Sequence, residues 1–225
     1  MPRLTRTAVV DAALDVAYRH GLDSLTIRKI ATELNVSPMA IYWHVKNKDE
    51  LLDAMGDRVC QELELTGDSS APWWEQLGTV LEDFMRALRA HPGAADIAVP
   101  RMLFSPNSRE AMEVALKALG DAGFSLTDAT QLARHGVRVA ISLVTEPLFT
   151  GPLSGGVEVS SERRAHVEQE VASTMESLDP NQFPNILASA ELLGDPSSRA
   201  AFEKLGLATY IAGVRALADS RDVSS

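Results

Sequence analysis

Two short helices and a tight turn can be read from the stretch Thr26-Ile-Arg-Lys-Ile-Ala-Thr-Glu-Leu-Asn-Val-Ser-Pro-Met-Ala-Ile-Tyr-Trp-His-Val-Lys-Asn-Lys48. Thr26 and Ser37 each stand where a helix N-cap is expected, and Pro38 follows Ser37 at the first helical position. Between the two helices, Asn35 tolerates the left-handed backbone that a tight turn requires. This arrangement predicts a helix-turn-helix.

A longer helix is expected before these two, from about Thr5 to His20, with Gly21 where a left-handed C-cap belongs. Its apolar residues fall on one face at helical spacing: Val9, Ala13, Val16 and Ala17. The two short helices have apolar pairs spaced for hydrophobic staples: Leu25 with Ile30, and Val36 with Ile41. The first 48 residues therefore predict a compact three-helix head.

The helix that starts at Ser37 has more large side chains than so small a unit can bury. Ile41 and Val45, four residues apart, point toward the core. The others are exposed candidates beside two lysines, a chemistry suited to a DNA groove with phosphates at its rim: Met39, Ala40, Tyr42, Trp43 and His44, with Lys46 and Lys48. In the alternative, Tyr42 and Trp43 are core aromatics and the lysines are a solvated edge, and the residues alone leave this open.

The stretch quoted above resembles the helix-turn-helix of the TetR family, and the resemblance extends over residues 5–55. The segment Ile41-Tyr-Trp-His-Val-Lys-Asn-Lys48, followed by Asp49-Glu50-Leu51-Leu52, is especially similar to the tetracycline-repressor branch. The resemblance implies a transcriptional regulator that binds double-stranded DNA. The DNA-contacting set it implies is Thr26, Arg28, Ser37, Pro38, Met39, Ala40, Tyr42, Trp43, His44 and Lys48.

Each of these residues has an implied role. Arg28 would reach a base edge or a phosphate, since its fork fits guanine. Residues 38–40 would lie deepest in the major groove, residues 42–44 would contact backbone and sugar edges, and Lys48 would hold a phosphate. Asn47 and Glu50 form a capping box that turns the next helix dipole toward that phosphate.

One departure from the tetracycline repressor concerns the start of this helix. The repressor has a polar amide there, whereas this chain has Pro38-Met39-Ala40. Apolar side chains read thymine methyl groups better than hydrogen-bonding edges. We therefore expect an operator that differs from the tetracycline operator and places thymines under Met39 and Ala40.

Charge is distributed unevenly along the 225 residues. The chain has a net charge of −10, but residues 1–48 carry +3, so the rest carries −13. A positive head on an acidic body suits a DNA-binding protein, because backbone binding needs only a local positive face. One cysteine, Cys60, excludes an intrachain disulfide and is expected to be buried. The sequence shows no signal peptide and no membrane-spanning run, so a cytoplasmic protein without membrane association is expected.

The rest of the chain predicts an all-α fold of about ten helices, in which the three-helix head joins a helical ligand-binding and dimerisation body. We expect a DNA-binding domain at 1–48, a connector helix at 48–65 and a second domain at 66–225. Its first helix is expected to open between Ser70 and Trp74 and to run to about Ala90. The others are expected near 95–104, 107–122 (capped by Asn107), 125 or 127 to 146, 161–177 (capped by Ser161), 184–193 and 196–217, with a flexible loop at 149–160.

Homodimerisation is implied by the resemblance. In the final helix a face rich in small residues permits close helix packing, and with the helix at 127–146 it is similar to the family's four-helix interface: Phe202, Leu205, Thr209, Ala212, Gly213, Ala216 and Leu217. Two heads related by a twofold axis read half-sites about 34–36 Å apart, so the expected operator is a short inverted repeat.

An unknown small-molecule effector is the other implied partner. Candidate contacts in the body are Leu81, Phe84, Leu88, Met102, Phe104, Met112, Leu116, Leu132, His135 and Val139. This mostly apolar set suits a hydrophobic ligand. Tetracycline–magnesium is not expected, because the family's metal-binding histidine is missing from residues 94–100, and neither a metal nor a cofactor is expected.

Two other classes of protein are the alternatives to a ligand-controlled repressor. The five histidines are scattered, and no hydrolase, metalloprotease or cysteine–histidine motif occurs, so an enzyme is not expected. The second alternative keeps the head but makes the protein an interaction module, or an activator without a small-molecule inducer. The sequence distinguishes neither repression from activation nor the regulated genes.

Overall fold

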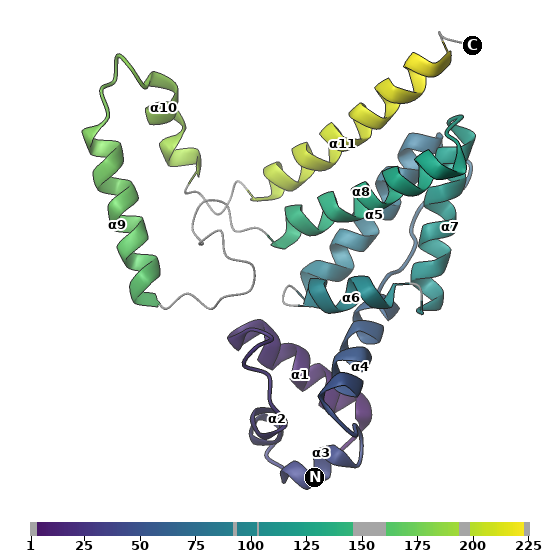
Figure 1. Cartoon of the computed structure of the whole chain (residues 1–225), viewed down its shortest axis with the longest axis vertical. Coiled ribbons are helices and arrows are strands. Elements are labelled where there is room, and N and C mark those ends of the chain that lie inside the picture. Colours follow the sequence, from purple (N-terminus) through teal and green to yellow (C-terminus); the bar gives the residue numbers. More distant parts are fainter. Residues whose placement is uncertain (1–3, 92–93, 103, 146–160, 194–198, 223–225) are drawn as a thin grey trace. The chain divides into compact units, whose positions relative to one another are not determined.

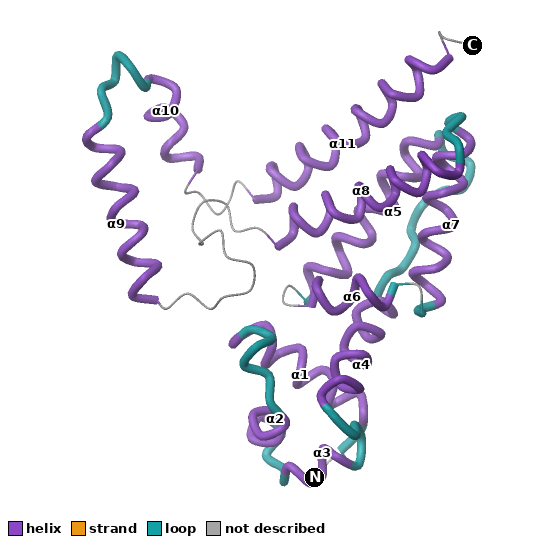
Figure 2. Tube along the Cα trace, viewed as in Figure 1, coloured by secondary structure: helices purple, strands orange, loops and turns teal. Residues whose placement is uncertain are grey.

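The computed structural model describes residues 4–91, 94–102, 104–145, 161–193 and 199–222. These residues form helices and loops without a strand (Figure 1, Figure 2), which confirms the all-α prediction. The eleven helices in the described residues are α1 (Arg6–His20), α2 (Ile27–Glu33), α3 (Pro38–Tyr42), α4 (Lys48–Gln61), α5 (Trp73–Ala90), α6 (Ala95–Arg101), α7 (Pro106–Asp121), α8 (Leu126–Thr145), α9 (Ser161–Ser177), α10 (Pro184–Leu193) and α11 (Arg199–Asp222).

The head (α1–α3 with the start of α4) has a single apolar core. The four residues predicted on the inner face of α1 are all buried: Val9, Ala13, Val16 and Ala17. Ile30 from α2 and Ile41 from α3 have no exposed surface, and Leu25 and Val45 are almost as deeply buried. Each such aliphatic side chain contributes about 1.5–3 kcal/mol on burial. This core fixes α3 from beneath and leaves its other face available.

The predicted caps form. The hydroxyl of Thr26 accepts a hydrogen bond from the Lys29 amide at 3.2 Å, and that of Ser37 accepts one from the Ala40 amide at 3.3 Å. Asn35 has a φ of 52°, the left-handed backbone that the turn between α2 and α3 was expected to need. The helix-turn-helix is therefore built as the sequence predicts.

Helix α4 leaves the head and packs against α6 in the body. The two backbones approach closely at Gly56, where a Cβ atom would lie 2.8 Å from the Ile97 carbonyl oxygen and 2.7 Å from Cγ of Arg101. Arg101 also pairs with two carboxylates of α4, Asp53 at 3.2 Å and Asp57 at 3.5 Å. The close backbone approach at Gly56 and the two ion pairs of Arg101 thus hold α6 against about one turn of α4.

In the body (α5–α8 with the end of α11), α5 packs against both α7 and α8. The buried hydrophobic residues of α11 are Leu207, Tyr210, Val214 and Ala218. The phenol of Tyr210 donates to the Leu132 carbonyl at 2.6 Å, and a Cβ atom at Gly206 would lie only 2.3 Å from Leu143. Gly206, which is not among the residues predicted for the dimer face, therefore allows α11 to approach α8 closely within one chain.

Some predicted boundaries and caps are wrong. The connector helix ends at Gln61 instead of Leu65. Asn107 does not cap α7, which begins at Pro106; its side-chain amide instead donates to the carbonyls of Gln61 and Leu63, both at 3.1 Å. Carbonyls at the end of α4 lack intrahelical donors, so the Asn107 amide satisfies a different helix terminus. Ser161 is the first residue of α9 and not the residue before it.

The chain divides into two compact units, one of residues 1–145 with 206–225 and one of residues 146–205. The second unit contains α9 and α10. The predicted flexible loop at 149–160 lies outside the described residues, as does the predicted start of the last helix at Pro196. The domain limits at 1–48 and 66–225 remain predictions. None of the described helices is both long and apolar enough to cross a bilayer.

Candidate nucleic-acid interface

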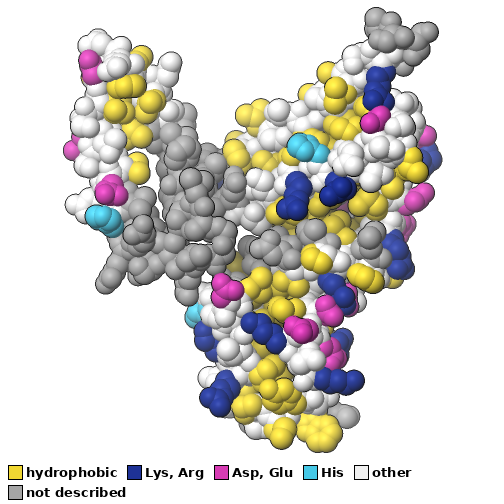
Figure 3. All heavy atoms as spheres, viewed as in Figure 1, with side chains coloured by type: hydrophobic (Ala, Val, Ile, Leu, Met, Phe, Trp, Pro, Cys, Tyr) yellow, Lys and Arg dark blue, Asp and Glu magenta, His cyan; other side chains and the backbone are white. Residues whose placement is uncertain are grey.

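Helix α3 presents its outer side to solvent. Met39 is 68% exposed, Tyr42 is 48% exposed and Trp43, its C-cap, is 86% exposed. The alternative in which Tyr42 and Trp43 are core aromatics is therefore wrong. Figure 3 shows apolar side chains at the end of the head where Figure 1 places α3, with Lys and Arg side chains nearby. Isolated apolar side chains at a surface are ordinary, but adjacent large ones indicate a binding surface.

The remaining predicted contact residues lie around this exposed end. Arg28, Pro38 and Lys48 are exposed, and Ala40 and His44 are half-buried. Thr26 and Ser37 are exposed too, but their hydroxyl oxygens already accept the capping hydrogen bonds. The structure thus brings the ten predicted DNA contacts together on the helix-turn-helix.

The basic side chains of the head form two groups. Arg6 lies 3.5 Å from Glu50, and Arg19 lies 2.7 Å from Glu33. The hydrogen bond and charge of Glu33 raise the pKa of Arg19. Within the described residues the others form no ion pair: Arg28, Lys29, Lys46 and Lys48. These four charges are available to phosphates. The sequence analysis named Arg28, Lys46 and Lys48 but missed Lys29.

The turn after α3 is held by Glu50. Its carboxylate accepts a hydrogen bond from the Lys46 amide at 2.9 Å, while its own amide donates to the Asn47 side chain at 2.7 Å. Asn47 thus caps α4 as expected, but Glu50 accepts from the residue before the N-cap, so the arrangement is a variant of the expected capping box. It fixes the backbone between Lys46 and Lys48, so both lysines extend from an ordered turn.

Ion pairs link the head to the body. Arg58 on α4 pairs with Asp11 of α1 at 3.2 Å and with Glu62 at 2.6 Å. Glu62 also lies 2.8 Å from the His91 ring at the end of α5. A displacement within the body can therefore reach α1 and α4 through direct contacts.

An apolar cavity lies in the body between α5, α7 and α8, with one residue each from the segments after α4 and α6. Its volume is about 20 Å³ and its lining is Leu63, Leu77, Val80, Leu81, Phe84, Met102, Ala111, Met112, Ala115, Ala133 and Val137. Four predicted effector contacts belong to this lining: Leu81, Phe84, Met102 and Met112. The space holds about one water molecule, so a larger ligand requires the helices to move apart.

The other six predicted effector contacts lie outside the cavity. Leu88 is fully buried elsewhere in the core, Phe104 is 65% exposed, and Leu116 and Val139 are half-buried. Leu132 and His135 sit on the α11 side of α8, where the His135 ring stacks on Tyr210 at 5.7 Å. The spacing of apolar residues indicated which face of each helix is buried. It did not indicate which neighbouring helix that face contacts.

Sequence reasoning also missed Asp83, a carboxylate that is only 1% exposed. It accepts hydrogen bonds from the amide of Thr66 at 2.8 Å and from its hydroxyl at 2.9 Å, and pairs with Arg86. Asp83 thereby fixes the loop before α5 beside the cavity. The sequence did contain a signal for this role: Asp83 is an acidic residue on the otherwise apolar, buried face of α5.

The predicted dimer face of α11 is exposed in this single chain. Ala212, Gly213 and Ala216 are all exposed, and Leu217 is 52% exposed. The neighbouring residues that are buried, such as Val214, point toward the body. An apolar and small-residue face is thus left uncovered along α11.

Known proteins show the same organisation. Residues 9–55 match the family model described as bacterial regulatory proteins, tetR family, and residues 66–218 match the tetracyclin repressor-like C-terminal domain. An HTH-type transcriptional regulator from Saccharopolyspora erythraea is 35% identical over 127 residues, which cover 56% of this chain and 54% of that protein. The chain thus spans about half the length of that relative.

Two further proteins are similar over more of their length. The class D tetracycline repressor protein from Escherichia coli is 32% identical over 187 residues, covering 80% of this chain and 77% of the repressor. The TetR family protein ActR from Streptomyces coelicolor, crystallised with actinorhodin, gives a TM-score of 0.66 at 28% identity, covering 96% of this chain and 99% of ActR. The expectation of a regulator instead of an enzyme is thereby confirmed. This chain belongs to the TetR family and is a DNA-binding transcriptional regulator.

Proposed function

We propose that the protein is a homodimeric repressor that binds an inverted-repeat operator and is released by a small apolar ligand. The observation that carries the DNA-binding half is the exposed outer side of α3, where Met39 is 68% and Trp43 86% exposed above a fully buried Ile41. A helix held from beneath, with its leading end uncovered, can enter the major groove without rearrangement. Residues 38–40 then face base edges.

The dimer is supported by the uncovered face of α11. One head reads only a few base pairs, so tight and specific binding requires two heads. The exposed residues Ala212, Gly213 and Ala216 permit close approach of a second copy, and Leu217 adds apolar area. A twofold axis along this face brings two identical helices together and leaves both heads available for consecutive half-sites.

The proposed release by a small apolar ligand is supported by the cavity between α5, α7 and α8. All eleven lining residues are apolar, which favours an uncharged or largely apolar molecule. ActR, similar in fold, was crystallised with actinorhodin. Because the cavity here measures only about 20 Å³, a ligand that enters it displaces the surrounding helices.

Such a displacement has a direct route to the head. Met102 lines the cavity and directly follows Arg101, whose guanidinium pairs with Asp53 and Asp57 of α4. A ligand that moves Met102 therefore pulls on α4, and α4 begins with Lys48 at the proposed phosphate contact. A coupling of about 1–3 kcal/mol between the two sites is the ordinary range for such regulators.

The operator is found by selecting genomic fragments that the purified protein retains. Thymine-to-uracil replacement, which removes only a methyl group, is then scanned along the selected site. We expect affinity to fall at symmetric positions under Met39 and Ala40, and Met39→Ala to remove this sensitivity. Exposed Lys117→Gln on α7 is the matched control. If the protein retains no duplex at low ionic strength, the proposed function is wrong.

The proposed effect of an apolar ligand on operator binding is tested with N-phenyl-1-naphthylamine, an uncharged apolar fluorophore. We expect its fluorescence to rise on binding and operator affinity to fall at the same concentrations. Ala115→Leu, which fills the cavity, should abolish both effects and leave operator affinity without fluorophore unchanged. Identical operator affinity at saturating fluorophore would exclude coupling from this cavity.

A further inference from the structure

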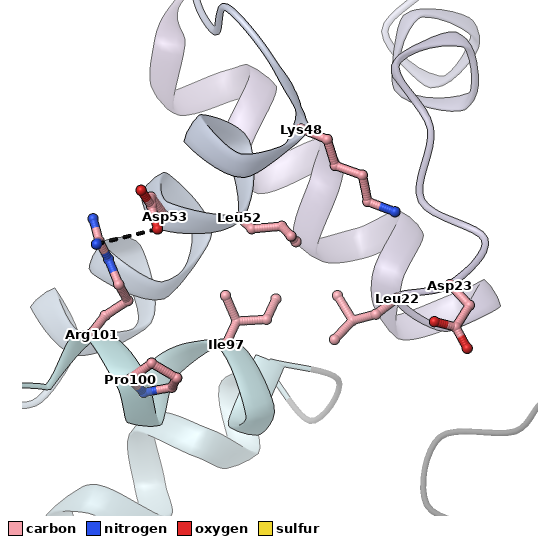
Figure 4. Close-up of a pocket in the computed structure, with 8 residues that line it drawn as sticks. All are labelled: Leu22, Asp23, Lys48, Leu52, Asp53, Ile97, Pro100 and Arg101. Atoms are coloured by element: carbon pink, nitrogen blue, oxygen red, sulfur yellow. Dashed lines mark ion pairs between the residues drawn. The ribbon is translucent and has the colours of Figure 1, made fainter.

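A second, larger hollow lies between the head and the body. This groove has a volume of about 350 Å³ and is distinct from the apolar cavity. Three elements contribute to it: the loop after α1, the first turns of α4, and α6 (Figure 4). Its lining is Leu22, Asp23, Lys48, Leu52, Asp53, Ile97, Pro100 and Arg101. The volume is at the lower end of the range for small-molecule sites, about 300–1,000 Å³.

The floor of the groove is apolar. In Figure 4 the side chains of Leu22, Leu52 and Ile97 converge from three different elements, and Pro100 lies beside them. None of the first three is fully buried, because each keeps part of its surface toward the groove. A ligand with an apolar body would therefore remove exposed apolar surface on both sides of the contact.

Some of the charged side chains around this floor have an ion-pair partner and others do not. Arg101 is paired with Asp53 at 3.2 Å and Asp57 at 3.5 Å, so its charge is balanced by α4. Lys48 and Asp23, by contrast, form no ion pair within the described residues, and Figure 4 shows them on different elements at one end of the groove. The groove thus offers one available cation and one available carboxylate.

This pairing selects against a ligand with a single charge. An anion attracted to Lys48 is repelled by Asp23, and a cation attracted to Asp23 is repelled by Lys48. A zwitterion satisfies both. We infer that this groove is a second ligand site, specific for a small zwitterion with an apolar body, the chemistry of an apolar or aromatic amino acid. Its carboxylate meets Lys48, its ammonium meets Asp23, and its side chain covers Leu22, Leu52 and Ile97.

Occupation of the groove has a consequence for DNA binding, and this step rests on the proposed function. Lys48 cannot hold the ligand carboxylate and a phosphate at the same time. Each phosphate contact contributes about 0.9 to the slope of log affinity against log salt concentration. Losing one contact therefore lowers operator affinity about eightfold per head at about 0.1 M salt. The amino acid would then weaken operator binding independently of the apolar cavity.

Binding is measured first without DNA, by calorimetric titration of the full chain with L-phenylalanine. Two analogues each lack one charge: N-acetyl-L-phenylalanine has no ammonium, and L-phenylalaninamide has no carboxylate. We expect L-phenylalanine to bind and each analogue to bind about fivefold more weakly, as the loss of one exposed ion pair implies. Asp23→Asn should weaken binding of L-phenylalanine and of L-phenylalaninamide, because both carry the ammonium that Asp23 meets. Its effect on N-acetyl-L-phenylalanine, which has no ammonium, should be absent or favourable.

The Ala115→Leu variant separates this groove from the apolar cavity, because it fills the cavity and should leave L-phenylalanine binding unchanged. Failure of L-phenylalanine, L-leucine and L-tryptophan all to bind would overturn the inference. Binding that is insensitive to Asp23→Asn would overturn it as well, since the ligand would then sit elsewhere. Neither result involves DNA, so the proposed repressor function is judged by the operator titration alone.

Discussion

Operator affinity is expected to fall steeply with salt, and the slope reports how many basic side chains meet phosphates. Each head has four basic side chains outside any ion pair in the described residues: Arg28, Lys29, Lys46 and Lys48. A dimer that engages all of them neutralises about eight phosphates, which predicts a log–log slope of about −7. Between about 50 and about 200 mM salt, affinity then falls about 10⁴-fold.

Lys48→Gln is the perturbation that tests this reasoning. It removes two phosphate contacts from the dimer, so the slope becomes shallower by about 1.8 and affinity at about 0.1 M salt falls roughly 60-fold. The matched control is Arg19→Gln. Arg19 is already 2.7 Å from Glu33 and is expected to make no phosphate contact, so this change should leave the slope unaltered.

The assay is fluorescence anisotropy of a labelled operator, titrated with each variant at several concentrations of potassium chloride. Thermal unfolding of the free proteins checks that both variants are folded. If Lys48→Gln keeps the wild-type slope, Lys48 does not contact a phosphate. If Arg19→Gln changes the slope as much as Lys48→Gln does, ion pairing in the free protein does not decide which cations meet DNA, and the argument fails.

Three further predictions concern Trp43, Gly56 and Tyr210. Trp43→Ala should leave the free energy of unfolding within about 0.5 kcal/mol, because the ring is 86% exposed, yet weaken operator binding about thirtyfold as each head loses a contact worth about 1 kcal/mol; equal loss of both would contradict a DNA role. Gly56→Ala should destabilise the protein by about 1–3 kcal/mol in urea unfolding, since a methyl group would lie 2.8 Å from the Ile97 carbonyl oxygen; an unchanged midpoint would mean that α6 is not pressed against α4. Burial raises the pKa of Tyr210 to about 12, so its neutral phenol stabilises the fold fully below about pH 10, and this contribution is lost between about pH 10 and 12. The unfolding free energy of the wild type should fall by about 3 kcal/mol relative to Tyr210→Phe over that range, and parallel pH profiles would exclude the effect.

Local signals made the head predictable. Thr26 and Ser37 cap helices because a hydroxyl can accept from an amide three residues on, and Asn35 adopts the left-handed backbone at small cost. These interactions lie within a few residues of each other in the chain. The burial of Ile41 beneath an exposed Trp43 follows from helical periodicity in the same way.

The body was less predictable because its site depends on contacts between distant helices. Apolar spacing found Leu81 and Phe84 on α5, which line the cavity, but equally favoured Leu88, one turn further along, which packs elsewhere. Asn107 looks like an N-cap in sequence, and its actual partners, the carbonyls of Gln61 and Leu63, are more than forty residues away. The rotation of each helix about its axis decides such contacts, and no local pattern encodes it.

The central claim is that the leading end of α3 enters the major groove in both halves of an operator. Met39→Cys in a Cys60→Ser background, labelled with an azidophenacyl group, tests it by photo-crosslinking to the selected duplex. The account predicts crosslinks to bases at two positions related by the operator's symmetry and about one helical turn apart, about 34–36 Å. A labelled protein that still binds the duplex but gives no crosslink from position 39, or crosslinks without this symmetry, would contradict it.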